Sequence, residues 1–155
     1  MKNILVTGAA GFIGANFVEY FVNKHPDYKV VVVDKLTYAG NMANLDKVKD
    51  KISFEKADIC DFEKVMWVFA KYRIDGVIHL AAESHVDRSI RDPFTFALTN
   101  VMGTLSLLQA AKLTWEALSE KYAGKRFYHI STDEVYGTLD FDGVLFKETN
   151  KYDPH

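Results

Sequence analysis

Cysteine is nearly absent from this sequence of 155 residues, and proline is scarce. Cys60 is the one cysteine, and there are three prolines. A single cysteine excludes an internal disulfide, so the fold must depend on its hydrophobic core, and the pattern fits a reducing compartment. We therefore expect a cytoplasmic protein.

Long hydrophobic runs and an excess of charge of either sign are also lacking. The formal net charge is −2, with 48% hydrophobic and 26% charged residues, which is ordinary for a globular domain with a core. The sequence has no pattern of a signal peptide and no apolar run long enough to cross a bilayer. We expect one domain, with neither nucleic acid nor a membrane as a partner.

Five apolar segments of β character predict a parallel sheet. They span residues 4–8, 30–34, 52–58, 76–82 and 126–132. Continuous runs of Val, Ile and Leu that alternate with helical patterns are typical of parallel sheets covered on both faces. The expected fold class is α/β: a Rossmann-type parallel sheet of about five strands in the order 3-2-1-4-5, with helices on both faces.

The segments between these strands have helical spacing of apolar residues. Helices are predicted over 12–24, over 61–71 with Asp61 as its cap, and over 95–122. Residues 138–155 show no clear core element.

The first strand runs into the sequence TGAAGFIG, which has the spacing of a phosphate-binding loop. Gly8 allows the tight turn, Gly11 allows a diphosphate to approach the backbone, and Gly14 lets the helix pack on the strand. The N–H groups at the helix start, at Phe12 and Ile13, would face the anion. The alternative is a tight turn without a ligand.

Two carboxylates follow the second and third strands. Asp34 lies 26 residues after Gly8, near the position where a carboxylate binds the adenosine ribose and disfavours a 2′-phosphate, which favours NAD over NADP. The alternative is a helix N-cap, and Lys35 beside it weakens the exclusion of NADP. Asp58 and Ile59 are placed to contact adenine, although Asp58 is equally suited to cap the next helix.

The fourth strand ends in Leu80, Ala81 and Ala82, whose small side chains leave room for a nicotinamide ribose. The following loop carries five polar residues: Glu83, Ser84, His85, Asp87 and Arg88. This loop would open at the switch point of the sheet, where ligands bind in α/β folds. The alternative is a solvated loop. His79 and His129 lie within strands and are expected to be buried and structural, and no His, Cys or Asp spacing predicts a metal site.

The last predicted strand runs into STDEVYG, where Asp133 and Glu134 are adjacent. Two carboxylates in one water-poor site cannot both ionise at low cost, so one of them could act as an acid and the other as a base. The alternative is an acidic turn capped by Thr132.

Taken in order, TGAAGFIG, DKLTYAGN, AAESHVDRSI, TNVMGT and STDEVYG resemble the extended short-chain dehydrogenase/reductase family of NAD-dependent epimerases and dehydratases, over essentially all 155 residues. Related epimerases carry small or hydroxyl residues in place of the acidic pair. The resemblance is therefore nearest to the dehydratases, and it implies NAD as the cofactor and a sugar nucleotide, dTDP-glucose, as the substrate.

The resemblance also implies residue roles. Glu134 would be the base at C5 of the sugar, Asp133 the acid for the departing C6 hydroxyl, and Thr132 the hydrogen-bond partner of the C4 oxygen. The implied cofactor-binding residues are Gly8, Gly11, Phe12, Ile13, Gly14, Asp34, Lys35, Thr37, Asp58, Ile59, Leu80, Ala81, Ala82 and Thr99. The implied substrate-binding residues are Ser84, His85 and Arg88.

One motif of the family is expected shortly after STDEVYG, just past His155, and so lies outside these residues. The family oxidises C4 with a Tyr-x-x-x-Lys pair, and only Tyr20 and Lys24 have that spacing here, on a helix expected to face away from the site. We expect residues 1–155 to be an incomplete NAD-binding domain without the sugar-nucleotide lobe, inactive alone, whose full-length form is a homodimer. The alternatives are another NAD-dependent sugar-nucleotide dehydratase, epimerase or decarboxylase, or a non-catalytic NAD-binding module.

Overall fold

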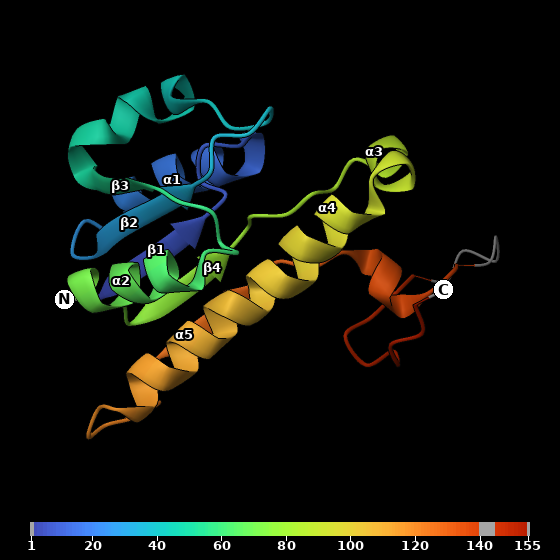
Figure 1. The fold of residues 1–155 in the computed structure, drawn as a ribbon. Helices are drawn as coiled ribbons and strands as arrows, with labels where there is room; N and C mark the ends of the chain where they lie inside the picture. The colour runs from blue at the N-terminus through green and yellow to red at the C-terminus, as the bar shows by residue number, and fades with distance from the viewer. Residues whose placement is uncertain (1, 140–144, 155) are drawn as a thin grey trace.

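The computed structural model describes residues 2–139 and 145–154 (Figure 1). Its centre is a five-stranded parallel sheet in the order β3-β2-β1-β4-β5. The strands are β1 (Asn3–Thr7), β2 (Lys29–Asp34), β3 (Ile52–Lys56), β4 (Gly76–His79) and β5 (Arg126–His129). The predicted fold class and strand order are confirmed. Because β1 pairs with both β2 and β4, the order of strands reverses there, which is where α/β sheets bind ligands.

Helices cover the sheet on both faces. On one face lie α1 (Phe12–Lys24) and the 3-10 helix η1 (Met42–Lys51), and on the other lie α2 (Phe62–Tyr72) and α5 (Thr104–Glu116). Alternate strand residues serve the two faces, since Leu5 packs toward α2 and α5 while its neighbour Val6 packs toward α1. This double burial explains why the inner strands β1 and β2 are continuous apolar runs.

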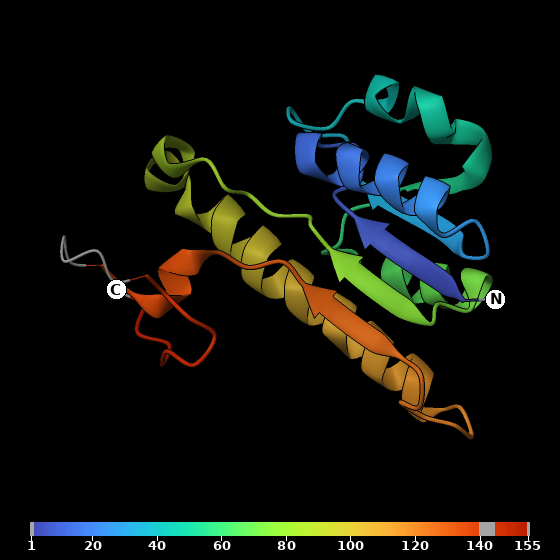
Figure 2. The same ribbon diagram turned by 180° about the vertical axis from the view of Figure 1, so that it is seen from behind.

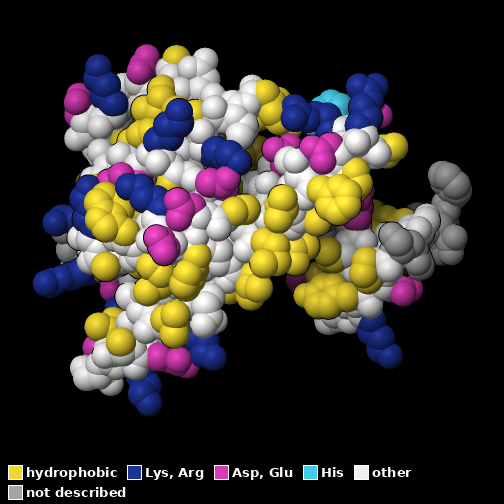
Figure 3. Space-filling model, viewed as in Figure 1, with side chains coloured by type: hydrophobic (Ala, Val, Ile, Leu, Met, Phe, Trp, Pro, Cys, Tyr) yellow, Lys and Arg dark blue, Asp and Glu magenta, His cyan; other side chains and the backbone are white. Residues whose placement is uncertain are grey.

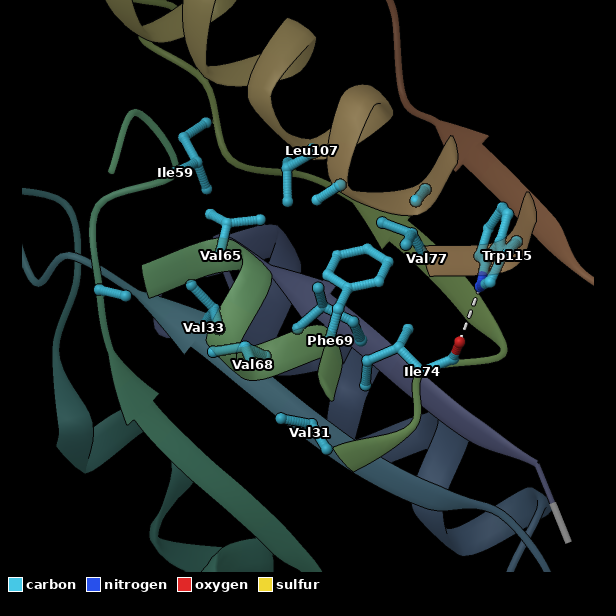
Figure 4. Close-up of a cluster of buried hydrophobic side chains, with 14 residues drawn as sticks. Val31, Val33, Ile59, Val65, Val68, Phe69, Ile74, Val77, Leu107 and Trp115 are labelled. Carbon is cyan, nitrogen blue, oxygen red and sulfur yellow. Dashed lines mark hydrogen bonds between the residues drawn. The ribbon is translucent and has the colours of Figure 1, made fainter. Parts of the chain in front are cut away.

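The core beneath α2 and α5 is the larger of the two clusters (Figure 4). Phe69 is fully buried at its centre, and Leu107 reaches it from α5. The indole nitrogen of Trp115 donates a hydrogen bond to the carbonyl oxygen of Ile74 at 2.8 Å, which ties α5 to the start of β4. The helix therefore has a fixed register on the sheet.

The predicted helix over 95–122 differs from the structure at both ends and in the middle. The helical segment consists of α4 (Pro93–Ala97), a π-helical stretch η2 (Leu98–Gly103) and α5, and it ends at Glu116. It ends there because the chain must return to the start of β5, which it does through a turn with left-handed residues at Lys121 and Gly124. The polar segment after β4, expected as a loop, contains a short helix, α3 (Val86–Arg91).

The face of the sheet that carries α1 is bare over β4 and β5 in the part of the chain that the structure describes (Figure 2). A hollow of about 710 Å³ lies there, lined by Phe17 and Phe21 of α1 and by Tyr128 of β5. His129, at the end of the edge strand β5 and paired in register with His79, is exposed, contrary to the expectation that it is buried. His79, on the inner strand β4, is buried as expected.

The helical segment Pro93–Glu116 is long and apolar enough to cross a membrane by length and composition, contrary to the expectation that no run is. A core helix of a soluble protein passes the same test, and Leu107 and Trp115 of this segment lie in the core. Figure 3 shows hydrophobic side chains gathered along its outer face. Its large exposed apolar residues include Leu98, Val101, Met102, Leu105 and Leu108.

Candidate cofactor and sugar-nucleotide site

The glycine loop between β1 and α1 is shaped by close backbone contacts. Gly8 has φ +70, and a Cβ there would lie 2.7 Å from the backbone of Ala81. A Cβ on Gly14 would overlap the carbonyl oxygen of Gly8, whereas one on Gly11 would lie 3.4 Å from the same oxygen. The first and third glycines are thus required by the fold, while the second leaves space at the N-terminus of α1.

A cavity of about 490 Å³ opens over this loop at the carboxyl ends of the strands. All fourteen residues predicted to bind the cofactor line it, as do Ser84 and Arg88, but His85 does not. Val33, Tyr38, Ala39, Gly40, Ala57, Glu83 and Thr95 also line it; the sequence placed Glu83 in a loop where ligands bind and predicted no role for the other six. The DKLTYAGN run is part of the family resemblance, but nothing in its pattern marks Tyr38 as part of a cavity wall.

The carboxylate of Asp34 accepts two backbone hydrogen bonds. Its Oδ2 accepts from Ala10 N at 2.9 Å, and its Oδ1 accepts from Leu36 N at 2.7 Å. The alternative role as a helix N-cap is wrong, because η1 is capped by Asn41, whose side chain accepts from Ala43 N. Asp34 joins the glycine loop to the loop after β2, and each oxygen keeps a lone pair that a ribose hydroxyl can use.

Asp58 forms an ion pair with Lys35, with 2.5 Å between Oδ2 and Nζ. Partial burial is the largest single influence and opposes ionisation of Asp58, but the hydrogen bond and charge of Lys35 together with the hydrogen bonds from Cys60 outweigh it, so the pKa of the carboxyl lies below its usual value. Asp58 is not a helix cap: Asp61 caps α2, as predicted, by accepting from Lys64 N at 3.0 Å. Lys35 is thus held at the third strand, beside the predicted adenine site.

His79 connects three elements directly beneath the cavity. Its Nδ1 lies 2.6 Å from Thr7 Oγ1 at the end of β1, and its Nε2 lies 3.0 Å from Thr104 Oγ1 at the start of α5. Thr104 donates its own proton to the Asn100 carbonyl, so it accepts from Nε2–H and Thr7 donates to Nδ1. Burial, and secondarily the nearby His129, lowers the pKa of His79 from 6.5 to about 4.

We expect this histidine to make folding pH-dependent. Between pH 6.5 and about 4 the unfolded chain binds a proton at His79 that the folded chain excludes, so stability falls as the pH falls through this window. The lowered pKa corresponds to about 3 kcal/mol of unfolding free energy. Urea unfolding of the His79→Gln variant should show a flatter pH profile there. The exposed His85→Gln control should keep the slope, and an unchanged slope in His79→Gln would contradict the assignment.

The π-helical stretch η2 places polar groups against the segment after β4. The side chain of Asn100 accepts from Glu83 N and donates to Glu83 O, both at 2.8 Å. Thr99 lines the cavity, and Gly103 packs so closely on Ile59 that a Cβ would lie 2.6 Å from its side chain. The widened turn of this π-helical stretch directs its residues to different neighbours: Thr99 to the cavity, Asn100 to Glu83 and Gly103 to Ile59.

The acidic pair lies on a short 3-10 helix, η3 (Asp133–Tyr136), just after β5. Thr132 caps this helix, since its hydroxyl accepts a hydrogen bond from Glu134 N at 3.4 Å. The alternative expectation, an acidic turn capped by Thr132, therefore describes the local backbone correctly. Thr132, Asp133 and Glu134 are exposed and do not line the cavity. Because the sheet is parallel, η3 and the glycine loop both follow the carboxyl ends of their strands and lie at the same edge.

Tyr20 and Lys24 contact each other on α1, with 2.5 Å between Nζ and the hydroxyl, and neither lines the cavity. They do face away from the candidate site. Among residues 2–139 and 145–154, no cluster of three or more His, Cys, Asp or Glu side chains is arranged to hold a metal ion.

Comparison with known proteins agrees with this geometry. The family model described as GDP-mannose 4,6 dehydratase matches residues 5–155. The chain belongs to this family. A dTDP-glucose 4,6-dehydratase of Neisseria meningitidis is 52% identical over 99% of the chain, and one of Escherichia coli strain K12 is 52% identical over 97%. The resemblance inferred from the motifs is confirmed.

Solved structures of two enzymes are similar to this chain in fold. The dTDP-glucose 4,6-dehydratase of Streptomyces venezuelae with NAD and TYD bound matches with a TM-score of 0.82 and 40% identity, over 98% of this chain and 45% of that one. A Thermus thermophilus UDP-glucose 4-epimerase complex with NAD matches with a TM-score of 0.81 and 31% identity, over 98% and 44%. The chain also spans only 44% and 45% of the length of the Neisseria meningitidis and Escherichia coli relatives.

Proposed function

We propose that this chain is the NAD-binding part of an NAD-dependent dTDP-glucose 4,6-dehydratase, which forms dTDP-4-keto-6-deoxyglucose in deoxysugar (rhamnose) metabolism. The observation that carries the proposal is the Thr132-Asp133-Glu134 group at the same sheet edge as the glycine-loop cavity. A dinucleotide site beside an acid and a base is what an oxidation coupled to loss of water requires. The two relatives named above support the same reaction.

The residues present fit a dinucleotide. Phe12 and Ile13 at the start of α1 line the cavity, and the N–H groups of a helix N-terminus suit a diphosphate. The contacts at Gly8 and Gly14 leave no room for a Cβ in the loop beneath it. Asp34 would hold the adenosine ribose, and Asp58 with Lys35 would border the adenine. When bound, NAD supplies a hydride acceptor for C4 of the sugar and afterwards the same hydride for C6.

The acidic group would carry out the elimination between these two transfers. The ketone at C4 acidifies the C5 proton, which Glu134 removes. Asp133 gives a proton to the C6 hydroxyl, which leaves as water, so the sugar loses one water in total. Thr132 would donate a hydrogen bond to the C4 oxygen. Adjacent side chains on one short helix can reach neighbouring carbons of one sugar, which is the positioning this step needs.

In residues 2–139 and 145–154, no Tyr-x-x-x-Lys pair lines the cavity, because Tyr20 and Lys24, which have that spacing, lie outside it. We therefore expect this chain alone to bind NAD and to turn over little or no substrate. The outer face of the Pro93–Glu116 helix, with its exposed apolar residues, is suited to pair with a second subunit in a full-length homodimer. A cytoplasmic location agrees with the single free cysteine.

The second candidate is a sugar-nucleotide epimerase, because the epimerase from Thermus thermophilus with NAD has a similar fold. The test is a fusion of this chain to the remaining part of the Neisseria meningitidis relative, incubated with dTDP-glucose and NAD. Mass spectrometry should detect a product that has lost one water. A product of unchanged mass, such as the C4 epimer, would favour the epimerase, and a fusion that binds both ligands without reaction would favour a non-catalytic module.

Replacing Asp34 by alanine should weaken NAD binding by about tenfold or more, since hydrogen bonds to a charged group are worth about 1.5–3 kcal/mol. Discrimination against NADP should fall as well, because the carboxylate that disfavours a 2′-phosphate is gone. Isothermal titration of both nucleotides measures this. Asp27→Ala removes an exposed carboxylate outside the cavity and is the control. Equal NAD affinity in wild type and Asp34→Ala would contradict the ribose assignment.

A further inference from the structure

Two rims of the cofactor cavity are joined by side chains of Tyr38, Glu83 and Arg88. The guanidinium carbon of Arg88 lies 3.7 Å from the centre of the Tyr38 ring, which is a cation–π contact. The Tyr38 hydroxyl donates to Glu83 Oε2 at 3.2 Å, across 45 residues of sequence. All three residues line the cavity over the glycine loop. We call this group the latch.

The rim that carries Tyr38 is fixed at both ends. At one end, the backbone N–H of Leu36 donates a hydrogen bond to Asp34 Oδ1. At the other end, the backbone N–H of Asn41 donates a hydrogen bond to the carbonyl oxygen of Ala10 in the glycine loop, at 3.0 Å. Gly40 lies so close to Asp34 that a Cβ would be 2.7 Å from its Oδ1. Tyr38 therefore stands on a short loop whose two ends are attached to the floor of the cavity.

The opposite rim is fixed through Glu83. Asn100 holds both the N–H and the carbonyl of Glu83, so the backbone of this residue cannot shift without breaking two hydrogen bonds. Arg88 follows on α3 and is exposed, as is Tyr38, whose side chain is 57% exposed. The anchored parts of the latch are backbone, whereas the parts that contact each other are side-chain ends that line the cavity.

We propose that the latch is a gate that a dinucleotide must open to enter or to leave the cavity; this rests on the proposed NAD site. The contacting groups all belong to the protein, so the contact can form with or without a dinucleotide behind it. A contact present in both situations slows passage in both directions and leaves the affinity nearly unchanged, because it has no differential interaction with the bound state. That behaviour separates a gate from a binding residue.

The test is stopped-flow binding of the fluorescent analogue etheno-NAD to wild type and to Tyr38→Ala. Loss of an exposed cation–π contact and one hydrogen bond should raise the association and dissociation rate constants by about fivefold each, with Kd changed by less than about twofold. Tyr38→Phe keeps the ring and loses only the bond to Glu83, so its rates should rise by about twofold. Unchanged rates in Tyr38→Ala, or a rise in dissociation alone with a weaker Kd, would overturn the gate.

Tyr20→Ala is the matched control, because Tyr20 is also 57% exposed and contacts a lysine, but lies outside the cavity. A second readout needs no ligand: hydrogen exchange of residues 36–40 and 83–88 should speed up in Tyr38→Ala and stay unchanged in Tyr20→Ala. If wild type binds no etheno-NAD, the proposed NAD site fails and with it the gate, even where hydrogen exchange shows that the rims are joined. If etheno-NAD binds and neither rates nor exchange respond, only the gate fails.

Discussion

Glu134→Gln in the chain fused to the remaining part of the Neisseria meningitidis relative is expected to lower the rate of dTDP-glucose dehydration about a thousandfold. The amide keeps the size of the side chain but cannot accept the C5 proton. Removal of a positioned base typically lowers the rate by about 10²–10⁴-fold. Exchange of the C5 proton with deuterated solvent should stop. Oxidation at C4 should persist, because it does not use Glu134, and the absorbance of reduced cofactor should therefore still appear.

Glu148→Gln is the control for this change, since it makes the same substitution at an exposed glutamate beyond η3. It should leave dehydration and C5 exchange unaltered. A fusion in which Glu134→Gln turns over at the unmodified rate would remove Glu134 from the mechanism. Loss of C4 oxidation together with C5 exchange would show that the residue positions the sugar, because both steps need a bound substrate.

Gly14→Ala should destabilise the fold by about 3 kcal/mol, because the added Cβ overlaps the carbonyl oxygen of Gly8 and backbone atoms cannot move aside cheaply. The intrinsic preference of helices for alanine over glycine would act in the opposite direction by about 1 kcal/mol. A lower unfolding free energy in Gly14→Ala would show that the steric overlap outweighs the helix preference, and a higher one would show the reverse. Thermal unfolding should show a midpoint lowered by roughly 10 °C.

Gly11→Ala separates the stability of the loop from its function. Its Cβ would lie 3.4 Å from the Gly8 oxygen, close enough to require a shift of a few tenths of an ångström but not an overlap. We expect unfolding close to that of wild type and NAD affinity lowered by at least about tenfold, because the methyl group occupies the approach to the helix N-terminus. A Gly14→Ala protein as stable as wild type would mean that α1 does not pack on the loop as described.

Several features followed from local sequence. The inner strands β1 and β2 could be located because doubly buried parallel strands are continuous apolar runs, and the glycine loop because its spacing reflects a fixed turn. The limits of the long helix were predicted less well, since its end depends on where β5 begins. His129 was misjudged for a similar reason: burial of a strand residue depends on what packs over it.

The residues of the cavity wall were likewise predicted only in part from the sequence. Asp34 was found from its distance to Gly8, but its bonds to Ala10 and Leu36 depend on how the loop folds back. Tyr38 and Arg88 are 50 residues apart in the sequence, and no periodicity relates them. Their contact arises only because β2 and β4 flank β1 in the sheet.

The sequence by itself predicted the parallel sheet, the glycine loop, the acidic pair and the family, because each of these depends on contiguous residues or on fixed short spacings. Only the tertiary structure decided which side chains meet across the cavity, that His79 is buried between Thr7 and Thr104, and that one face of β4 and β5 is bare in the described residues. The physical reason is that burial and contact are properties of packed neighbours, and packing joins residues whose separation along the chain carries no signal.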